Sequence, residues 1–343
     1  MYVTNNPRIP LTLDSGVVYA NYKSGTGTDT LVFEYQVTSL DYDVDGFKID
    51  KLPDFDFGLY TDSDKNDIKS PFNINVSTVL IDGIIPTLQN ITVPDDNYIY
   101  NELVTFTANF NEPIFITNGT PYLELDVDGT PVFANYTSGS GTNVLTFTHR
   151  ITTTDLDLDG IGNSGTIEFN SANMNDFVGN IATVTFTTNT SGVTFDGIIP
   201  FVSSITPPAN NTYSIGDTLS FTYNFSEMVN IVGAGLETII NIDSGNRKIS
   251  YTSGSGTASI LFDYTIVEGD NDLDGLVMDG NISLIPTTTI SDASGNNSLL
   301  TFTPSDLSSI TIDGIRPAIN SISLPADSTY IVGTNLDFTL NFS

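Results

Sequence analysis

The chain has 343 residues, with 41 acidic and 10 basic side chains, a formal net charge of −31 and no cysteine. A field of this sign repels nucleic acid and anionic membrane surfaces, and the absence of thiols excludes disulfides and thiolate metal sites. The sequence shows no signal-peptide pattern and no apolar run long enough for membrane insertion. The remaining partner classes are cations, neutral sugars and other proteins.

Apolar and polar residues alternate in short runs along the chain, which is the period-two pattern of half-buried strands. Turn residues, mostly Gly, Asn, Ser and Asp, separate the runs. No window of a dozen residues carries a helical stripe, so the sequence predicts an all-β fold. In chain order the clearest runs are residues 31–37, 103–110, 145–147, 219–225, 261–264 and 336–342.

The strand pattern repeats about every 115 residues. A Tyr-x-Ser-Gly-x-Gly-Thr hairpin occurs three times, with spacings of 114 and then 115 residues, at residues 22–28, 136–142 and 251–257. Asp-Gly-Ile-x-Pro stretches keep the same phase and end at Pro86, Pro200 and Pro317. A period of this length indicates whole domains, because a solenoid turn takes only about 20 to 50 residues.

These landmarks predict tandem immunoglobulin-like β-sandwich domains forming an elongated rod. We expect residues 87–200 and 201–317 to be complete repeats. Residues 1–86 are then the C-terminal part of an incomplete repeat, and residues 318–343 are the N-terminal strands of another. Two interpretations of this frame stand side by side: a fragment of a longer array, or head-to-tail assembly into a filament, in which the last strands of one copy complete the first half-domain of the next.

A set of short motifs occurs at fixed spacing across essentially the whole chain. The set comprises Pro-Tyr-Leu-Glu-Leu at 121–125, Phe-Ser-Glu at 225–227, Tyr-Thr-Ser-Gly-Ser-Gly-Thr at 251–257 and Asp-Ala-Ser-Gly-Asn at 292–296. This combination resembles the tandem immunoglobulin-like repeats of giant bacterial surface proteins and adhesins. The resemblance implies an extracellular or cell-surface spacer or adhesive stalk, and it leaves the bound ligand open because a fold does not fix a function.

An Asp-x-Asp-x-Asp-Gly triplet recurs once per repeat and is the strongest chemical signal of the chain. Three carboxylates two residues apart, followed by a glycine turn, suit a hard cation with oxygen ligands, and we expect calcium. The alternative is a strand in which Leu156, Leu158 and Ile161 face the core and the aspartates face water. The candidate ligands are Asp41, Asp43, Asp45, Asp155, Asp157, Asp159, Asp270, Asp272 and Asp274.

A second candidate calcium site lies at the joints between repeats. It combines the joint aspartates with turn aspartates and with glutamates at strand ends, and such a site would lock neighbouring domains. The alternative is ordinary turn chemistry. The residues concerned are Asp82, Asp196 and Asp313 at the joints, Asp62, Asp176 and Asp292 in the turns, and Glu112 and Glu227 at the strand ends.

Catalysis has little support in the sequence. The single histidine, His149, occurs in one repeat only, so no Ser-His-Asp device repeats with the fold. We therefore expect a non-enzymatic structural or adhesive protein whose partners are other copies of itself or neighbouring repeats. The alternative is a module that binds a host or surface glycan or protein through its loops.

Overall fold

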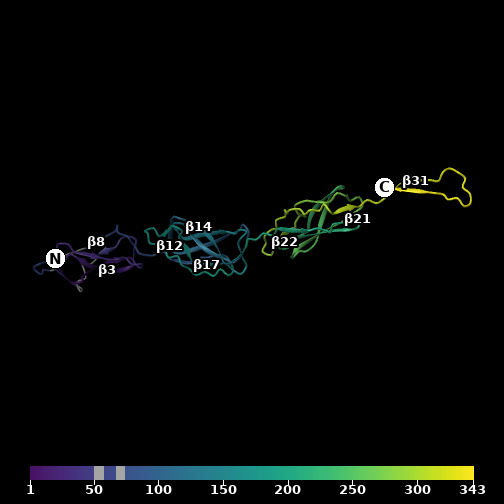
Figure 1. The fold of residues 1–343 in the computed structure, drawn as a ribbon. Helices are drawn as coiled ribbons and strands as arrows, with labels where there is room; N and C mark the ends of the chain where they lie inside the picture. Colours follow the sequence, from purple (N-terminus) through teal and green to yellow (C-terminus); the bar gives the residue numbers. More distant parts are fainter. Residues whose placement is uncertain (50–57, 67–73) are drawn as a thin grey trace. The chain divides into compact units, whose positions relative to one another are not determined.

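The computed structural model describes residues 1–49, 58–66 and 74–343. Over these residues the chain forms strands and no helix, which confirms the all-β prediction. The strands follow one another along the sequence from purple to yellow (Figure 1). The chain divides into two compact units: residues 1–96, 103–150 and 157–194 form unit 1, and residues 97–102, 151–156 and 195–343 form unit 2.

Residues 1–86, in unit 1, hold a five-stranded sheet and two short strand pairs. The sheet has the order β4-β3-β2-β6-β8, so β4 lies at its edge. The sheet strands are β2 (Arg8–Leu13), β3 (Gly16–Ser24), β4 (Val32–Glu34), β6 (Lys48–Ile49) and β8 (Ile74–Asn75). The short pairs are β1 (Tyr2–Asn5) with β7 (Gly58–Thr61), and β5 (Tyr42–Asp43) with β9 (Ile81–Asp82).

The main sheet of residues 87–200 has the order β10-β12-β15-β14-β13-β17, and β18 pairs with the far end of β12. Its strands are β10 (Leu88–Thr92), β12 (Leu103–Asn118), β13 (Tyr122–Val127), β14 (Thr130–Ser138), β15 (Thr142–Arg150), β17 (Gly162–Glu168) and β18 (Ala172–Asn175). A smaller sheet, β11-β19-β16, comprises β11 (Asn97–Ile99), β19 (Thr194–Asp196) and β16 (Leu156–Asp157).

Residues 201–317, in unit 2, repeat this topology as β20-β22-β25-β24-β23-β27, with β28 on β23, β29 on β22, and a small sheet β21-β30-β26. The large sheet contains β20 (Val202–Thr206), β22 (Thr218–Val232), β23 (Leu236–Ile242), β24 (Gly245–Ser253), β25 (Thr257–Thr265), β27 (Val277–Met278), β28 (Ser283–Leu284) and β29 (Thr289–Ser291). The small sheet contains β21 (Thr212–Ser214), β26 (Asn271–Asp272) and β30 (Thr311–Asp313), and a final hairpin joins β31 (Ile319–Ser323) to β32 (Thr339–Phe342).

The longest strands, β12 and β22, each change partners midway. β12 pairs with β15 up to Asn109, its register then shifts, and from Phe115 it pairs with β18. β22 likewise pairs with β25 up to Asn224 and with β29 from Asn230. Glu112 and Glu227 lie inside these two breaks, where the strand leaves one sheet and enters the other.

The period-two pattern of the sequence sets the core. Along β12 the inward residues Val104, Phe106, Ala108 and Phe110 are buried, while the residues between them are partly exposed. Phe106 lies opposite Phe147 of β15, which is fully buried. The alternating strand predictions are therefore confirmed in β12, β15, β22 and β25. In the predicted run 31–37 only Val32–Glu34 form a strand, and β32 begins at Thr339 whereas the alternation begins at residue 336.

The repeated Tyr-x-Ser-Gly-x-Gly-Thr hairpin is held by its tyrosine. The Tyr136 ring packs edge-on against Phe147 at 6.0 Å between centroids, and its hydroxyl accepts the Ser140 N–H at 2.9 Å. Gly139 has φ +112°, and a Cβ there would collide with the Val144 carbonyl, so only glycine fits. The same tyrosine contacts recur in the other two hairpins.

Replacing Phe147 with Ala tests the inferred core. We expect Phe147→Ala to lower the free energy of unfolding by about 3 to 5 kcal/mol, because it leaves a cavity where a fully buried ring stood. The matched control is Phe177→Ala in the same unit, where the side chain is 86% exposed and the expected change is within about 0.5 kcal/mol. Urea unfolding measures both. Equal losses would contradict the packing described here.

Candidate metal sites in the acidic loops

The first aspartate of each triplet is buried and closes a turn. Asp155 Oδ2 accepts the Thr152 N–H at 2.8 Å, and Asp41 and Asp270 accept the equivalent N–H at 2.6 and 2.9 Å. The leucines beside the aspartates point outward, with Leu158 63% exposed. The alternative in which Leu156 and Leu158 face the core is therefore wrong, because the hydrogen-bonded carboxylates occupy the inner positions and only Ile161 is buried as that alternative expected.

Asp270 accepts hydrogen bonds at both carboxylate oxygens. Its carboxylate accepts hydrogen bonds from the Tyr264 hydroxyl at 2.7 Å and from Arg247 Nε at 2.6 Å, in addition to the Val267 N–H. Burial alone raises the pKa of Asp270, but these hydrogen bonds and the guanidinium charge outweigh it and hold the pKa below its usual value. The first aspartate is therefore a structural group whose bonding is already satisfied.

The joint glycine packs against the same turn, which explains the Asp-Gly sequence at each joint. The Gly197 N–H donates to the Asp155 carbonyl at 2.7 Å, and a Cβ on Gly197 would collide with the Thr152 carbonyl. Gly83 and Gly314 make the equivalent bond to Asp41 and Asp270, at 2.8 and 2.7 Å. The turn and the joint are thus fixed together in all three positions.

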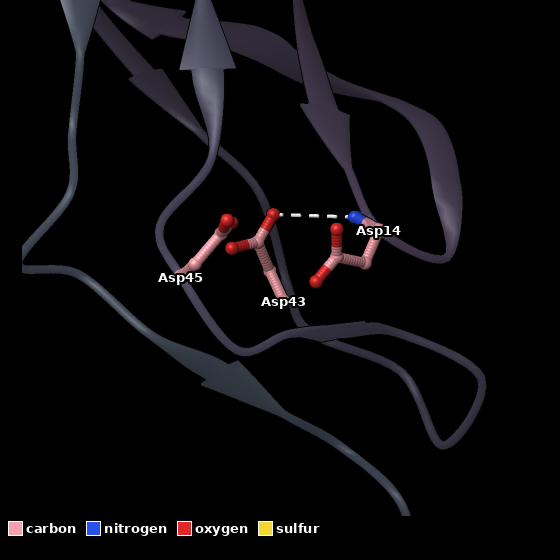
Figure 2. Close-up of side chains that lie close together, drawn as sticks. All are labelled: Asp14, Asp43 and Asp45. Atoms are coloured by element: carbon pink, nitrogen blue, oxygen red, sulfur yellow. Dashed lines mark hydrogen bonds between the residues drawn. The ribbon is translucent and has the colours of Figure 1, made fainter.

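The second aspartate of each triplet is also buried, and Asp43 and Asp157 link the triplet loop to a hairpin turn. Asp43 Oδ1 accepts the Gly46 N–H at 2.6 Å, while its Oδ2 accepts the Asp14 N–H at 3.2 Å (Figure 2). The Asp14 carboxylate in turn accepts the Val44 N–H at 3.1 Å. Asp157 makes the same two kinds of bond, with the N–H groups of Gly160 and Asp128.

The second and third aspartates of two triplets cluster with an aspartate that the sequence analysis missed. Each cluster places three carboxylates within 4.8 Å of one another, and in each the third aspartate is exposed. The missed residues, Asp14 and Asp243, lie in the hairpin turns. Together with Asp128 they occupy the same position in successive repeats, so the repeat period was the sequence signal that could have identified them. The clusters are Asp14, Asp43 and Asp45 (Figure 2), and Asp243, Asp272 and Asp274.

The middle triplet, Asp155, Asp157 and Asp159, does not form such a cluster among the described residues. Asp159 is exposed, and its N–H donates to Asp157 Oδ1 at 3.3 Å. In every triplet the first aspartate lies outside the clusters of the described chain. The three carboxylates of a triplet therefore do not converge on one point, although the second and third do so with the hairpin aspartate in two repeats.

The structure brings the predicted joint residues together in unit 1. Carboxylate oxygens of Asp82, Glu112 and Asp176 lie within 4.8 Å of one another. Glu112 Oε1 is buried and has no hydrogen-bond partner among the described residues. Burial, together with the charges of Asp82 and Asp176, raises the pKa of Glu112. The cluster thus combines an unpartnered oxygen with a local excess of negative charge.

The equivalent joint in unit 2 has the same unpartnered glutamate oxygen. Glu227 Oε1 is buried without a hydrogen-bond partner in the described chain, and Asp196 and Asp292 are both buried. Burial, followed by the charges of Asp292 and Asp196, raises the pKa of Glu227 to about 7. Two aspartates therefore influence a strand-break glutamate at two successive joints, but among the described residues only the unit 1 carboxylates lie within 4.8 Å of one another.

The turn asparagines fasten the joints. Asn180 Nδ2 donates to the Asp82 and Ile84 carbonyls at 3.0 and 3.1 Å, and Asn296 Nδ2 donates to the Asp196 carbonyl at 2.9 Å. Within each turn an aspartate oxygen accepts several N–H groups, as Asp176 Oδ1 does from residues 178–180. The turn chemistry weighed as an alternative is therefore present, and it leaves the glutamate oxygens unsatisfied.

Three other candidates lie outside these joint sites. Asp313 Oδ1 accepts the Ile315 N–H at 3.2 Å, and Asp62 closes a turn with Asn66; neither belongs to an acidic cluster of the described residues. The His149 Nδ1 lies 3.1 Å from the Phe133 carbonyl, in hydrogen-bond contact with the neighbouring strand. These positions add no ligand to either joint.

Comparisons with known proteins return likenesses among solved structures. No family model matches the sequence, and a search of curated proteins finds no match. Among solved structures, a DUF4785 family protein from Legionella pneumophila is similar over 64% of this chain, with 13% sequence identity and a TM-score of 0.24. The match covers 55% of that chain, so this chain spans about half of it.

A search for membrane-crossing helices gives a negative result. Within the described ranges, no helix has the length and apolar character that a crossing requires.

Neutralising Asp270 tests the structural role of the first triplet aspartate. Because its pKa is lowered in the folded state, its contribution is present above pH 3.8 and is lost as the pH falls through the folded value. We expect Asp270→Asn to cost about 1.5 to 3 kcal/mol at neutral pH, since it removes charged hydrogen bonds, and to flatten the acid loss of stability of unit 2. Urea unfolding across a pH series measures this, with the exposed Asp327→Asn as control. An unchanged acid slope would contradict the assignment.

Proposed function

We propose that this chain is part of an extracellular stalk: a tandem array of immunoglobulin-like β-sandwich repeats that forms an elongated, calcium-stiffened rod at a cell surface. Its role is structural or adhesive rather than catalytic. The support is the same strand order in residues 87–200 and 201–317, with the same hairpin, turn and joint contacts in each.

The observation that carries the calcium proposal is the unpartnered glutamate oxygen at both joints. Glu112 and Glu227 each hold a buried Oε1 without a hydrogen-bond donor, beside two aspartates. A cation would satisfy such an oxygen and would offset the repulsion between the carboxylates around it. Carboxylate oxygens are the ligands that calcium prefers, so these residues fit the ion.

Calcium bound there would connect three separate elements of a joint. In unit 1 the aspartate at the end of β9, the glutamate at the break of β12 and the turn aspartate after β18 would share one ion. The ion would replace mutual repulsion with attraction, and the asparagine contact to the joint carbonyls already holds the same elements. Calcium would then limit bending at the joint, which is what a stalk requires.

Calcium titration of stability tests this proposal. With free calcium at ten times the dissociation constant, each site adds about 1.4 kcal/mol to the free energy of unfolding. We expect chelator to remove this gain and Glu112→Gln with Glu227→Gln to abolish it, because an amide loses the ligand charge. Thermal unfolding with calcium and with chelator measures the gain.

The control for this experiment is Glu124→Gln on β13, which lies in no acidic cluster of the described residues and should keep the full calcium response. If the double glutamine variant showed a calcium-dependent gain in stability of the same size, calcium would bind at a site other than these joints. The absence of any gain in the unaltered chain would overturn the proposal of a calcium-stiffened stalk.

A second candidate function, a glycan- or protein-binding module, is favoured by one surface feature. Phe115 and Phe177 lie with their ring centroids 6.0 Å apart, Phe177 is 86% exposed and the nearby Ile181 is 65% exposed. In residues 201–317 the position of Phe177 is held by Ala293, so the aromatic pair belongs to one repeat only. Exposed aromatic rings of this kind suit a sugar face or an apolar side chain.

A binding screen separates the two functions. If the chain is a binding module, an immobilised glycan array should retain it, and Phe177→Ser should reduce retention at least tenfold without lowering the unfolding temperature. A spacer should show no retention that depends on Phe177. Ala293→Ser, at the equivalent position of the next repeat, is the matched control.

A further inference from the structure

A row of three outward residues crosses neighbouring segments in residues 87–200. Phe115 of β12 lies opposite Asn175 of β18, and Asn175 forms a bridge with Ile181. Directly opposed residues of an antiparallel pair share one face of the sheet, so these side chains point to the same side. Their chain neighbours Ile114 and Met174 are fully buried, which places the row on the solvent side.

Phe177 extends this row with a second aromatic ring. The Phe115 and Phe177 ring centroids lie 6.0 Å apart at an interplanar angle of 60°. Phe115 is 36% exposed, Phe177 86% and Ile181 65%. Phe115 also lies close to the neighbouring hairpin, since a Cβ on Gly141 would lie 3.5 Å from its ring. We name Phe115, Asn175, Phe177 and Ile181 the aromatic platform, and all four residues belong to unit 1.

The next repeat has the same framework without the apolar side chains. There Asn230 lies opposite Ser291, and Ser291 bridges to Asn297, in the register of the platform row. Ala293 holds the position of Phe177. Asn230, Ala293 and Asn297 are all exposed, so no described segment of the complete repeat 201–317 covers this place. The exposure therefore belongs to the repeat, whereas the aromatic rings are specific to residues 87–200.

A second aromatic pair in residues 87–200 has a structural counterpart in the next repeat, and the platform does not. Tyr122 and Phe133 lie on adjacent strands with their ring centroids 4.8 Å apart. At the equivalent positions Lys248 and Glu237 form an ion pair at 2.6 Å. A cross-strand contact thus occupies these positions in both repeats, as expected for a contact that stabilises the sheet. No aromatic or ionic contact replaces the platform rings, because alanine and asparagine stand there.

The groups beside the platform rings are uncharged. Asn175 carries its amide between Phe115 and Ile181. On the same strand, Asn173 Nδ2 donates to Thr117 Oγ1 at 3.4 Å. An amide offers both a donor and an acceptor, and the rings offer apolar faces. This combination matches a sugar, which presents hydroxyls at its edge and C–H groups on its face.

Charge decides between the possible occupants. Arg150 is the only lysine or arginine of residues 87–200, and it lies opposite Leu103 at the start of β12, whereas Phe115 lies near the end of that strand. An anionic ligand therefore finds no basic side chain of this repeat near the platform, and the net charge of −31 repels it, as it repels a second copy of this chain. The platform also carries no carboxylate to hold a basic peptide. A neutral ligand meets none of these obstacles.

We propose that the aromatic platform binds a neutral polysaccharide. A sugar ring packs its C–H face against Phe115 and Phe177, and the Asn175 amide forms hydrogen bonds with the sugar hydroxyls. The inference rests on the second candidate function, the binding module, and names its ligand class. Polysaccharides with carboxylate or sulfate groups are disfavoured by the charge of the chain.

Affinity electrophoresis of the full chain tests the ligand class. The probes are dissolved dextran and mannan, which are neutral, and carboxymethyl dextran and alginate, which are anionic. We expect a neutral polysaccharide to retard the chain, with no loss when the salt concentration is raised, because no charge pair holds the ligand. Retardation by the anionic probes alone would overturn this inference and leave the binding module standing. No retardation by either neutral probe would overturn the inference, and the stalk proposal would be unaffected.

Exchanging the rings for the residues of the next repeat tests the platform itself. Phe115→Asn/Phe177→Ala should weaken retardation about tenfold or more, while the unfolding temperature is kept, because a complete repeat already carries these residues at these positions. The matched control is Phe133→Ala, which removes a partly exposed ring of the structural pair and should keep full retardation. An equal loss in the control would overturn the assignment.

Transplanting the platform gives the reciprocal test. Four substitutions in residues 201–317 are added to the chain that carries Phe115→Asn/Phe177→Ala: Asn230→Phe, Ser291→Asn, Ala293→Phe and Asn297→Ile. We expect retardation by the neutral polysaccharide to return to within about threefold of the unaltered chain, because the strand register is the same in both repeats. A transplanted chain that unfolds cooperatively but is not retarded would overturn the proposal.

Discussion

Buried carboxylates govern how the loops of each repeat are joined. Removing a carboxylate from water is costly unless hydrogen bonds or charges replace the lost hydration. In each triplet the first aspartate meets this demand by closing its own turn, and its carbonyl receives the joint glycine. The second aspartate binds the triplet glycine, and in two repeats also the turn of a hairpin about 30 residues earlier. Two side chains thus hold together segments distant in sequence.

The donors for these carboxylates are mostly backbone N–H groups, because basic side chains are scarce. Arg247, beside Asp270, is an exception that occurs in one repeat. Backbone donors impose strict local geometry, so the loops carry Gly, Thr and Ser where the backbone must approach closely. At the joints the backbone N–H groups of the turn donate to the turn aspartates. The strand-break glutamates therefore keep a buried oxygen without a hydrogen-bond donor among the described residues. The distinction between structural and ion-binding carboxylates follows from that shortage.

The all-β class and the repetition were predictable from sequence, since alternation and period depend on local pattern. The inward direction of the triplet aspartates was not, because Leu156 and Leu158 are the more apolar residues and alternation alone assigns them to the core. The aspartates face inward because the folded loop places backbone N–H donors around their carboxylates, and this arrangement is not visible in the sequence. The pairing of Glu112 with Asp82 and Asp176 was foreseen from the repeated phase, but the strand break that buries its oxygen required the register of β12.

The same strand explains why a repeat of this type is not an independent unit. β12 and β22 each begin in one sheet and end in the other, and their glutamates lie at the crossing. The burial of such a strand depends on later strands of its own repeat. The glutamate at the point where the strand changes sheets also interacts with an aspartate of the preceding joint. Among the described strands β32 pairs with β31 alone, and it is shorter than the alternation predicts. Strand length and side-chain burial are therefore set by the neighbouring strands, and the residues of the strand itself specify only which face they will cover.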